Sequence, residues 1–206
     1  MNALQRHALL WPQAQAWPGL IAGALQNSSL PPVLQQDEIR RYLALWAQQD
    51  WPLVVARQNQ AAMRDGVIAL GLSLPPLADG TKPRLALQIA LEQVQHIQPP
   101  LSLVQVLASA QATPAMRLTN VSRLAAYAQD LDLRVYGSWS WQVLTGLQYI
   151  QASSDIDLLF TPDDQAQLQQ GSRWFELASQ ELILDGELVF PMGRAVAWRE
   201  WQRSSA

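Results

Sequence analysis

The first half of the chain consists of short apolar segments separated by polar and proline-containing stretches. Residues 52–57, 67–72 and 84–91 are rich in Val, Ile and Leu and are bounded by proline or glycine or by polar residues. Short runs of these residue types between turn-forming residues are typical of strands. We therefore predict three strands in this half.

One segment of the first half has a helical period instead. Its apolar positions recur every three to four residues, as they do on the buried face of an amphipathic helix. Asp37 precedes these positions and is suited to cap the N-terminus, so we predict a helix from Asp37 through Gln49. The apolar positions are Ile39, Tyr42, Leu43 and Trp46.

Helices and strands alternate after the Pro99-Pro100 pair, which suggests a second domain. The pattern predicts an α+β fold, with a smaller strand-rich domain at residues 1–98 and a domain of mixed sheet and helices at residues 99–206. The Asp185-Gly186 dipeptide favours a tight hairpin turn. The predicted elements of this half are helices at 101–110, 114–129, 139–149 and 162–170 and strands at 133–136, 155–160, 181–184 and 188–190.

Composition excludes several classes of protein. The chain has 206 residues and no cysteine, which rules out disulfides, thiolate metal sites and a cysteine nucleophile. Its net charge of -3 argues against a nucleic-acid partner, because such proteins usually carry a basic face. The apolar runs are far shorter than the roughly 20 residues of a membrane span. We therefore expect a cytoplasmic protein with neither membrane nor nucleic acid as partner.

Gly137-Ser138 lies between a predicted strand and a predicted helix. Glycine permits close approach of a ligand to the backbone, and the free N–H groups at a helix start bind phosphate. An isolated Gly-Ser pair is more often a simple turn, so this signal is weak by itself.

Asp155 and Asp157 open a predicted strand. Because side chains alternate along a strand, both carboxylates lie on one face, roughly 7 Å apart at Cα, while Ile156 and Leu158 face the core. Carboxylates so placed suit Mg²⁺, which also binds the phosphates of a substrate. The alternative is a solvated strand end, which an isolated Asp-x-Asp favours.

The order strand, Gly-Ser, helix, strand with Asp-x-Asp resembles the core of polymerase-beta type nucleotidyltransferases. Within that superfamily, the stretch 136–160 is similar to the phosphoribosyl-dephospho-coenzyme A transferases that mature malonate decarboxylase, its holo-acyl-carrier-protein synthases. The resemblance implies a nucleotidyltransferase-like catalytic domain at residues 99–206 and a substrate- or partner-binding domain before it. The residues that carry it are Gly137, Ser138, Trp141, Gln142, Leu144, Thr145, Gly146, Leu147, Tyr149, Ser154, Asp155 and Asp157.

The resemblance also implies a reaction. The enzyme would transfer the 2'-(5-phosphoribosyl)-3'-dephospho-CoA group from triphosphoribosyl-dephospho-CoA to a serine of the apo acyl carrier subunit of malonate decarboxylase, releasing pyrophosphate. Asp155 and Asp157 would hold Mg²⁺. The superfamily uses a third carboxylate as metal ligand or base, for which Asp185 and Glu187 are equal candidates; Asp185 falls in the predicted turn, whereas Glu187 opens a strand.

Substrate contacts are expected from two groups of residues. The resemblance implies that Gly137, Ser138, Trp141, Gln142 and Thr145 line the substrate site. Three cations of the first half are candidates for a wall that binds phosphates, although each is as readily an ordinary solvated charge. These cations are Arg57, Lys82 and Arg84.

Aromatic and histidine residues are weighed in the same way. One of Trp139, Trp141 and Trp198 is a candidate for stacking on adenine, but core packing is the expectation for most tryptophans. His7 is a candidate substrate contact, and a lone histidine near a chain start is more often a surface or capping residue.

Two alternative functions remain open from the sequence. One is a nucleotidyltransferase that uses ATP on another acceptor. The other is a non-catalytic module that binds a carrier protein through its arginines.

Overall fold

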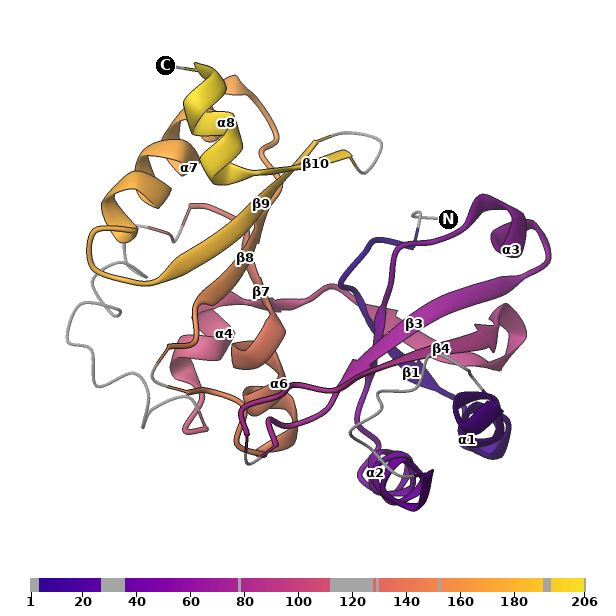
Figure 1. Ribbon diagram of the computed structural model, residues 1–206. Coiled ribbons are helices and arrows are strands. Elements are labelled where there is room, and N and C mark those ends of the chain that lie inside the picture. The colour runs from indigo at the N-terminus through magenta and orange to yellow at the C-terminus, as the bar shows by residue number, and fades with distance from the viewer. Residues whose placement is uncertain are drawn as a thin grey trace. The chain divides into compact units, whose positions relative to one another are not determined.

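The computed structural model describes residues 4–26, 36–77, 79–111, 128, 130–151, 153–190 and 194–205. The chain folds as two compact units, Met1–Pro99 and Pro100–Ala206. Each unit contains a five-stranded sheet with helices (Figure 1). The fold is therefore α+β, with one sheet in each unit.

The first unit has an antiparallel sheet in the order β4-β3-β2-β1-β5. Side chains alternate along β3 and β4, so that Ile68, Leu70 and Leu72 are buried opposite Ile89, Leu87 and Leu85. The strands are β1 (Leu9–Pro12), β2 (Leu53–Val55), β3 (Val67–Ser73), β4 (Arg84–Ala90) and β5 (Val94–Gln98).

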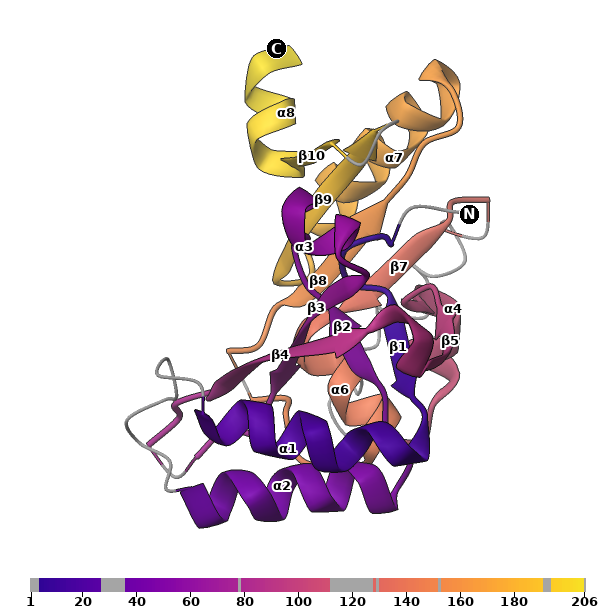
Figure 2. The same cartoon turned by 90° about the vertical axis from the view of Figure 1, so that its right-hand side faces the viewer.

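Two long helices of the first unit pack against each other, and α1 also packs on β4 (Figure 2). The α2 helix buries Ile39, Leu43 and Trp46, which share one face because they lie three or four residues apart. The helices are α1 (Trp17–Gln26), α2 (Gln36–Gln48) and the short α3 (Gln60–Arg64), with 3-10 turns η1 (Ala14–Ala16) and η2 (Leu91–Gln93).

The second unit has a mixed sheet in the order β10-β9-β8-β7-β6. The central pair β8 and β9 is parallel, and the other pairs are antiparallel. This parallel pair matters for the site, because it aligns the start of β8 with the start of β9. The strands are β6 (Leu101–Ser102), β7 (Leu133–Tyr136), β8 (Ile156–Phe160), β9 (Leu184–Phe190) and β10 (Arg194–Ala197).

Helices of the second unit pack on one face of this sheet. Val106, Trp139, Phe175 and Trp198 come from four different helices and join one core with Leu158 of β8. Residues that alternate with this core, including Asp157 and Asp185, therefore lie on the other face of the sheet. The helices are α4 (Leu103–Ala108), α6 (Gly137–Thr145), α7 (Gln165–Ala178) and α8 (Trp198–Ser205).

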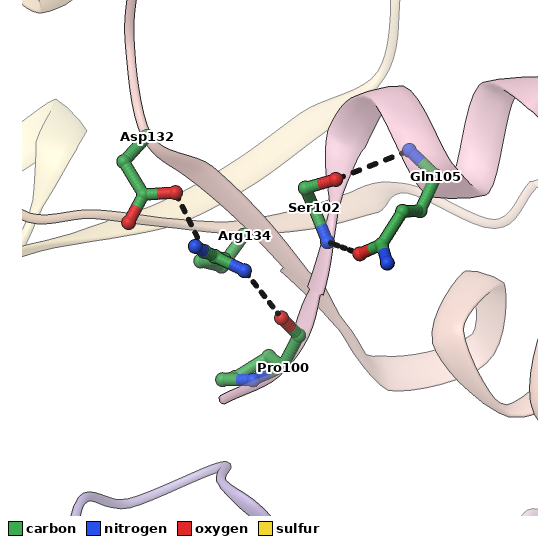
Figure 3. A network of polar contacts seen from close by, with 5 residues as sticks. All are labelled: Pro100, Ser102, Gln105, Asp132 and Arg134. Atoms are coloured by element: carbon green, nitrogen blue, oxygen red, sulfur yellow. Dashed lines mark hydrogen bonds and ion pairs between the residues drawn. The ribbon is translucent and has the colours of Figure 1, made fainter. Parts of the chain in front are cut away.

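Most of the predicted elements are confirmed, with shifted ends. The α2 helix begins at Gln36, so Asp37 lies in its first turn instead of at the N-cap. The helix predicted from residue 101 begins at Leu103, because a capping box formed by Ser102 and Gln105 ends β6 there (Figure 3). The helix predicted at 139–149 covers Gly137–Thr145, and the one predicted at 114–129 lies outside the described residues.

The predicted hairpin turn at Asp185-Gly186 is wrong. Both residues lie inside β9, which runs on to Phe190 and then pairs with β10. The space at this position is tight, because a Cβ on Gly186 would stand 3.0 Å from the Leu158 carbonyl oxygen and 3.0 Å from the Phe175 ring. The glycine therefore marks close contact between the sheet and α7, and the strand continues through it.

Candidate metal and phosphate site

Three aspartates come together at the start of the parallel pair β8–β9. Asp157 stands opposite Asp185 in the register of the two strands, and Asp155 lies directly before β8. One carboxylate oxygen from each residue lies within 4.8 Å of the other two. Asp155 and Asp157 are half-buried, and Asp185 is exposed to solvent.

This arrangement fits a divalent cation. Carboxylate oxygens are the ligands that Mg²⁺ takes, usually only one or two from the protein beside water and substrate phosphates. Three negative charges so close together repel one another, and a bound cation removes that repulsion. The chemistry of the donor set therefore supports a metal at this place.

The start of α6 lies directly against the Asp157 carboxylate. Gly137, the first residue of α6, has a φ of 68°, and a Cβ added there would overlap the carboxylate of Asp157. The positive end of the helix dipole thus stands beside the acidic group. Gly137 thus lies against Asp157 and Ser138 follows it in α6, and only glycine fits the first of these positions.

Gln142 holds the segment that leads from α6 toward Asp155. Its side-chain oxygen accepts hydrogen bonds from the backbone N–H of Tyr149 (3.1 Å) and Ile150 (2.9 Å), and its Nε2 donates to the Gln111 carbonyl (2.9 Å). The side chain is 6% exposed. Gln142 therefore links α6 to the segment 149–150 and to Gln111 through buried hydrogen bonds. This role was not predicted from the sequence, although a polar residue at a buried helix position is a signal for it.

Thr145 and Trp141 also have internal partners. The Thr145 hydroxyl donates to the Trp141 carbonyl (2.7 Å) and accepts from the Leu147 N–H (3.1 Å), next to the left-handed Gly146 that ends α6. The Trp141 ring stacks on Tyr149 with centroids 6.2 Å apart. These contacts shape the loop after α6, and substrate contact by either residue stays a prediction.

The structure distinguishes the two candidates for the third carboxylate. Among the described residues, the group that could share an ion contains Asp185 and lacks Glu187. Glu187 stands opposite Leu159, two residues further along the sheet. From the sequence the two residues are equal candidates, with Asp185 in a predicted turn; the strand that replaces this turn brings Asp185 beside Asp157.

Arg134 lies on the same face of the sheet as Asp157, two residues before Tyr136, which is the strand partner of Asp157. Its Nε forms an ion pair with Asp132 (2.6 Å), and its Nη1 donates to the Pro100 carbonyl (3.3 Å), as Figure 3 shows. Its charge is thus already matched by a local carboxylate.

The predicted cationic residues belong to the first unit. Arg57 follows β2 and is exposed, Lys82 precedes β4 and is half-buried, and Arg84 opens β4 opposite Ser73. A phosphate-binding role for these three residues stays a prediction.

His7 is held in an unusual environment in the first unit. Its φ is 72°, and its backbone N–H donates to the Val55 carbonyl (2.9 Å). Burial, followed by the positive charge of Arg6, lowers the pKa of His7 from 6.5 to about 4. The neutral ring is therefore a structural part of this unit at physiological pH.

The candidate adenine-stacking rings are buried. Trp139, Trp141 and Trp198 are 3%, 5% and 4% exposed, and Trp198 stacks on Phe175 with centroids 5.3 Å apart. Rings so enclosed offer little face to a ligand, and core packing is the role that the structure shows for them.

Comparison with known families gives two matches that together cover nearly the whole chain. Residues 5–100 match the phosphoribosyl-dephospho-CoA transferase MdcG N-terminal domain, and residues 100–206 match the MdcG C-terminal domain. The chain belongs to the phosphoribosyl-dephospho-CoA transferase family. It is accordingly a transferase, and the three aspartates lie in the part that matches the C-terminal domain.

Individual relatives in the phosphoribosyl-dephospho-CoA transferase family support this assignment. A protein of that name from Xanthomonas axonopodis pv. citri (strain 306) is 37% identical over 95% of this chain and 84% of its own length. Another from Bradyrhizobium diazoefficiens (strain JCM 10833 / BCRC 13528 / IAM 13628 / NBRC 14792 / USDA 110) is 36% identical over 77% of this chain and 69% of its own length. No solved structure gives a significant match to the chain. Within the described residues, no helix is long and apolar enough to cross a bilayer.

Proposed function

We propose that this transferase moves the 2'-(5-phosphoribosyl)-3'-dephospho-CoA group from triphosphoribosyl-dephospho-CoA to a serine of the apo acyl carrier subunit of malonate decarboxylase. The serine oxygen forms a bond to the α-phosphorus. The bond from that phosphorus to its bridging oxygen breaks, and the electron pair leaves with pyrophosphate. The serine proton passes to a carboxylate of the site and then to solvent.

The observation that carries the proposal is the carboxylate group of Asp155, Asp157 and Asp185. One carboxylate oxygen from each residue lies within 4.8 Å of the other two. The group lies beside the first residue of α6, Gly137, where only glycine fits. Phosphoryl transfer requires positioning and electrostatic stabilisation more than covalent chemistry, and this site offers both. The family assignment supports the donor, because its name contains that group.

Individual residues receive separate roles in this proposal. Asp155 and Asp157 bind Mg²⁺, which when bound neutralises the charge of the phosphates. The backbone N–H groups at Gly137 and Ser138 bind phosphate oxygens at the start of α6. Asp185, exposed to solvent, is the third carboxylate: one of its oxygens completes the metal-binding group, and the other takes the proton of the incoming serine.

The direct test uses the purified protein, Mg²⁺, the triphosphoribosyl precursor and the apo carrier subunit. We expect the intact mass of the carrier subunit to rise by the mass of the transferred group, with one pyrophosphate released per modified subunit. Label transferred from ATP to an unrelated acceptor would instead indicate a different nucleotidyltransferase. An unchanged carrier mass with active reagents would contradict the proposal.

Matched variants separate catalysis from simple binding. We expect Asp157→Asn to reduce transfer by about 100-fold or more, because it removes an anionic ligand while keeping nearly the same shape. Asp163→Asn is the control, since Asp163 is an exposed aspartate in the loop before α7. A non-catalytic module would keep carrier binding in both variants and would show no transfer in either of them or in the wild type.

A further inference from the structure

The β9 strand extends past the end of its neighbour β10. In the pairing of the two strands, Ala197 is the last residue of β10 and stands opposite Glu187. The chain then turns into α8, which leaves the first residues of β9, Leu184 to Gly186, beyond the reach of β10. These residues include Asp185, so the third carboxylate lies on a strand segment that has a strand neighbour, β8, on one side.

Where β10 no longer pairs with β9, the side chain of Arg199 contacts the β9 backbone instead. Its Nη2 donates to the carbonyl of Leu184 (3.1 Å), the residue directly before Asp185. The backbone of β9 is thus held from both sides at this point, by β8 through pairing and by α8 through one guanidinium group.

Arg199 is exposed to solvent and makes a second contact besides the hydrogen bond to Leu184. Its guanidinium carbon lies 4.9 Å from the centroid of the Trp198 ring, within the range of a cation–π interaction. Trp198 is 4% exposed and stacks on Phe175, so the ring that supports Arg199 belongs to the core. The contact with a buried ring favours the arginine position in which its guanidinium group donates to Leu184.

We propose that Arg199 is a positioning residue, which fixes the start of β9 so that the Asp185 carboxylate meets those of Asp155 and Asp157. This inference rests on the metal site of the proposed function. Arg199 acts through the backbone of Leu184, and its role differs from that of the metal ligands themselves. Residues that orient ligands in this way commonly change metal affinity by about 10-fold to 100-fold when they are replaced.

The test measures Mn²⁺ affinity of the full chain by electron paramagnetic resonance, without substrate. We expect Arg199→Gln, whose amide donor sits on a shorter side chain, to raise the Kd for Mn²⁺ by about 10-fold, and Arg199→Lys, whose longer side chain keeps charged N–H donors, to raise it less. Arg203→Gln is the matched control, because Arg203 is on the same helix and its Nε donates to the Arg199 carbonyl within that helix. Its Kd should equal that of the wild type.

The direction of the change in Mn²⁺ affinity distinguishes a positioning role of Arg199 from a purely electrostatic one. A positive charge that merely lies near the site would repel Mn²⁺, so its removal would tighten binding. An Arg199→Gln protein that binds Mn²⁺ as tightly as the wild type, or more tightly, would overturn the inference.

A second measurement tests the positioning without any metal. Amide hydrogen exchange at residues 183–187 should be faster in Arg199→Gln than in the wild type and in Arg203→Gln. If the wild type bound no Mn²⁺, the proposed metal site would fail, and this exchange comparison would still decide whether Arg199 fixes β9. Equal exchange in the three proteins would overturn the inference.

Discussion

At the scale of single residues, the account depends on which side chains the strands bring together. Asp157 and Asp185 are 28 positions apart in the sequence, and the parallel register of β8 and β9 makes them neighbours. Glu187 lies on the same face of the sheet as Asp185 but one step further along it. The strand register therefore determines that Asp185, and not Glu187, lies beside Asp157.

Replacement of each candidate carboxylate tests this assignment. We expect Asp185→Asn to lower the rate of transfer to the carrier subunit by about 100-fold or more, because a charged group beside the reacting atoms is lost. Glu187→Gln should leave the rate close to that of the wild type. Steady-state rates from carrier mass measurements provide the comparison, and a larger loss in Glu187→Gln would reverse the assignment.

His7 predicts a pH dependence of stability in the first unit. Its pKa is 6.5 in the unfolded chain and about 4 in the folded one, so between these values only the unfolded chain takes up a proton at this site. The free energy of unfolding contributed by His7 is therefore fully present above pH 6.5 and is lost as the pH falls toward 4.

Urea unfolding at several pH values measures this effect. We expect the free energy of unfolding of the wild type to fall more steeply from pH 6.5 to 4.5 than that of His7→Asn, in which the titrating group is absent. Asparagine is suitable because it tolerates the φ of 72° at this position. Parallel pH profiles for the two proteins would contradict the pKa assignment.

Among the secondary structure elements, a helix and a strand each continue through a glycine near which the sequence predicts an end or a turn. The helix predicted at 162–170 covers Gln165–Ala178, and Gly171 lies inside it. Gly186 likewise lies inside β9, where the sequence predicts a turn. In both cases the local pattern suggests a break, and the requirement for close packing appears only in the three-dimensional contacts.

Gly171 gives a prediction opposite to that of helix propensity. Alanine in a helix is favoured over glycine by about 1 kcal/mol, yet a Cβ at Gly171 would overlap the buried ring of Phe160. We expect Gly171→Ala to lower the free energy of unfolding by about 1–3 kcal/mol, as overpacking does.

A second helical glycine provides the control for that experiment. Gly23 lies in α1, and a Cβ there would meet nothing within 4 Å. Gly23→Ala should therefore raise the free energy of unfolding by roughly 0.5–1 kcal/mol. Urea denaturation of both variants gives the comparison, and stabilisation by Gly171→Ala would show that α7 does not pack closely on β8.

Local patterns were most informative where they were strongest. The Val, Ile and Leu content of the short segments 67–72 and 84–91 predicts the strands β3 and β4, and the helical period after Asp37 predicts α2. The strand with Asp155 and Asp157 and the Gly-Ser start of α6 were also predicted and are placed side by side. The position of Asp185 beside Asp157 and the hydrogen bonds of Gln142 depend on contacts between residues that are apart in the sequence. Hydrophobic periodicity carries no information about such contacts.

In the molecule as a whole, the candidate metal ligands and the candidate phosphate-binding cations belong to different units. The carboxylate group, the α6 start and Arg199 all belong to the second unit, Pro100–Ala206. The first unit contains the cations that the sequence offers for phosphate binding, Arg57, Lys82 and Arg84. We propose that the three aspartates of the second unit hold a divalent cation that serves group transfer.

Crystallography with a stand-in cation tests this claim most directly. Crystals of the full chain would be soaked with Mn²⁺ and the triphosphoribosyl precursor, and anomalous scattering from manganese would be located. We predict a peak within coordination distance of Asp155, Asp157 and Asp185, with precursor phosphates beside the start of α6. Precursor bound elsewhere, or manganese absent from these carboxylates when the precursor is bound, would contradict the account.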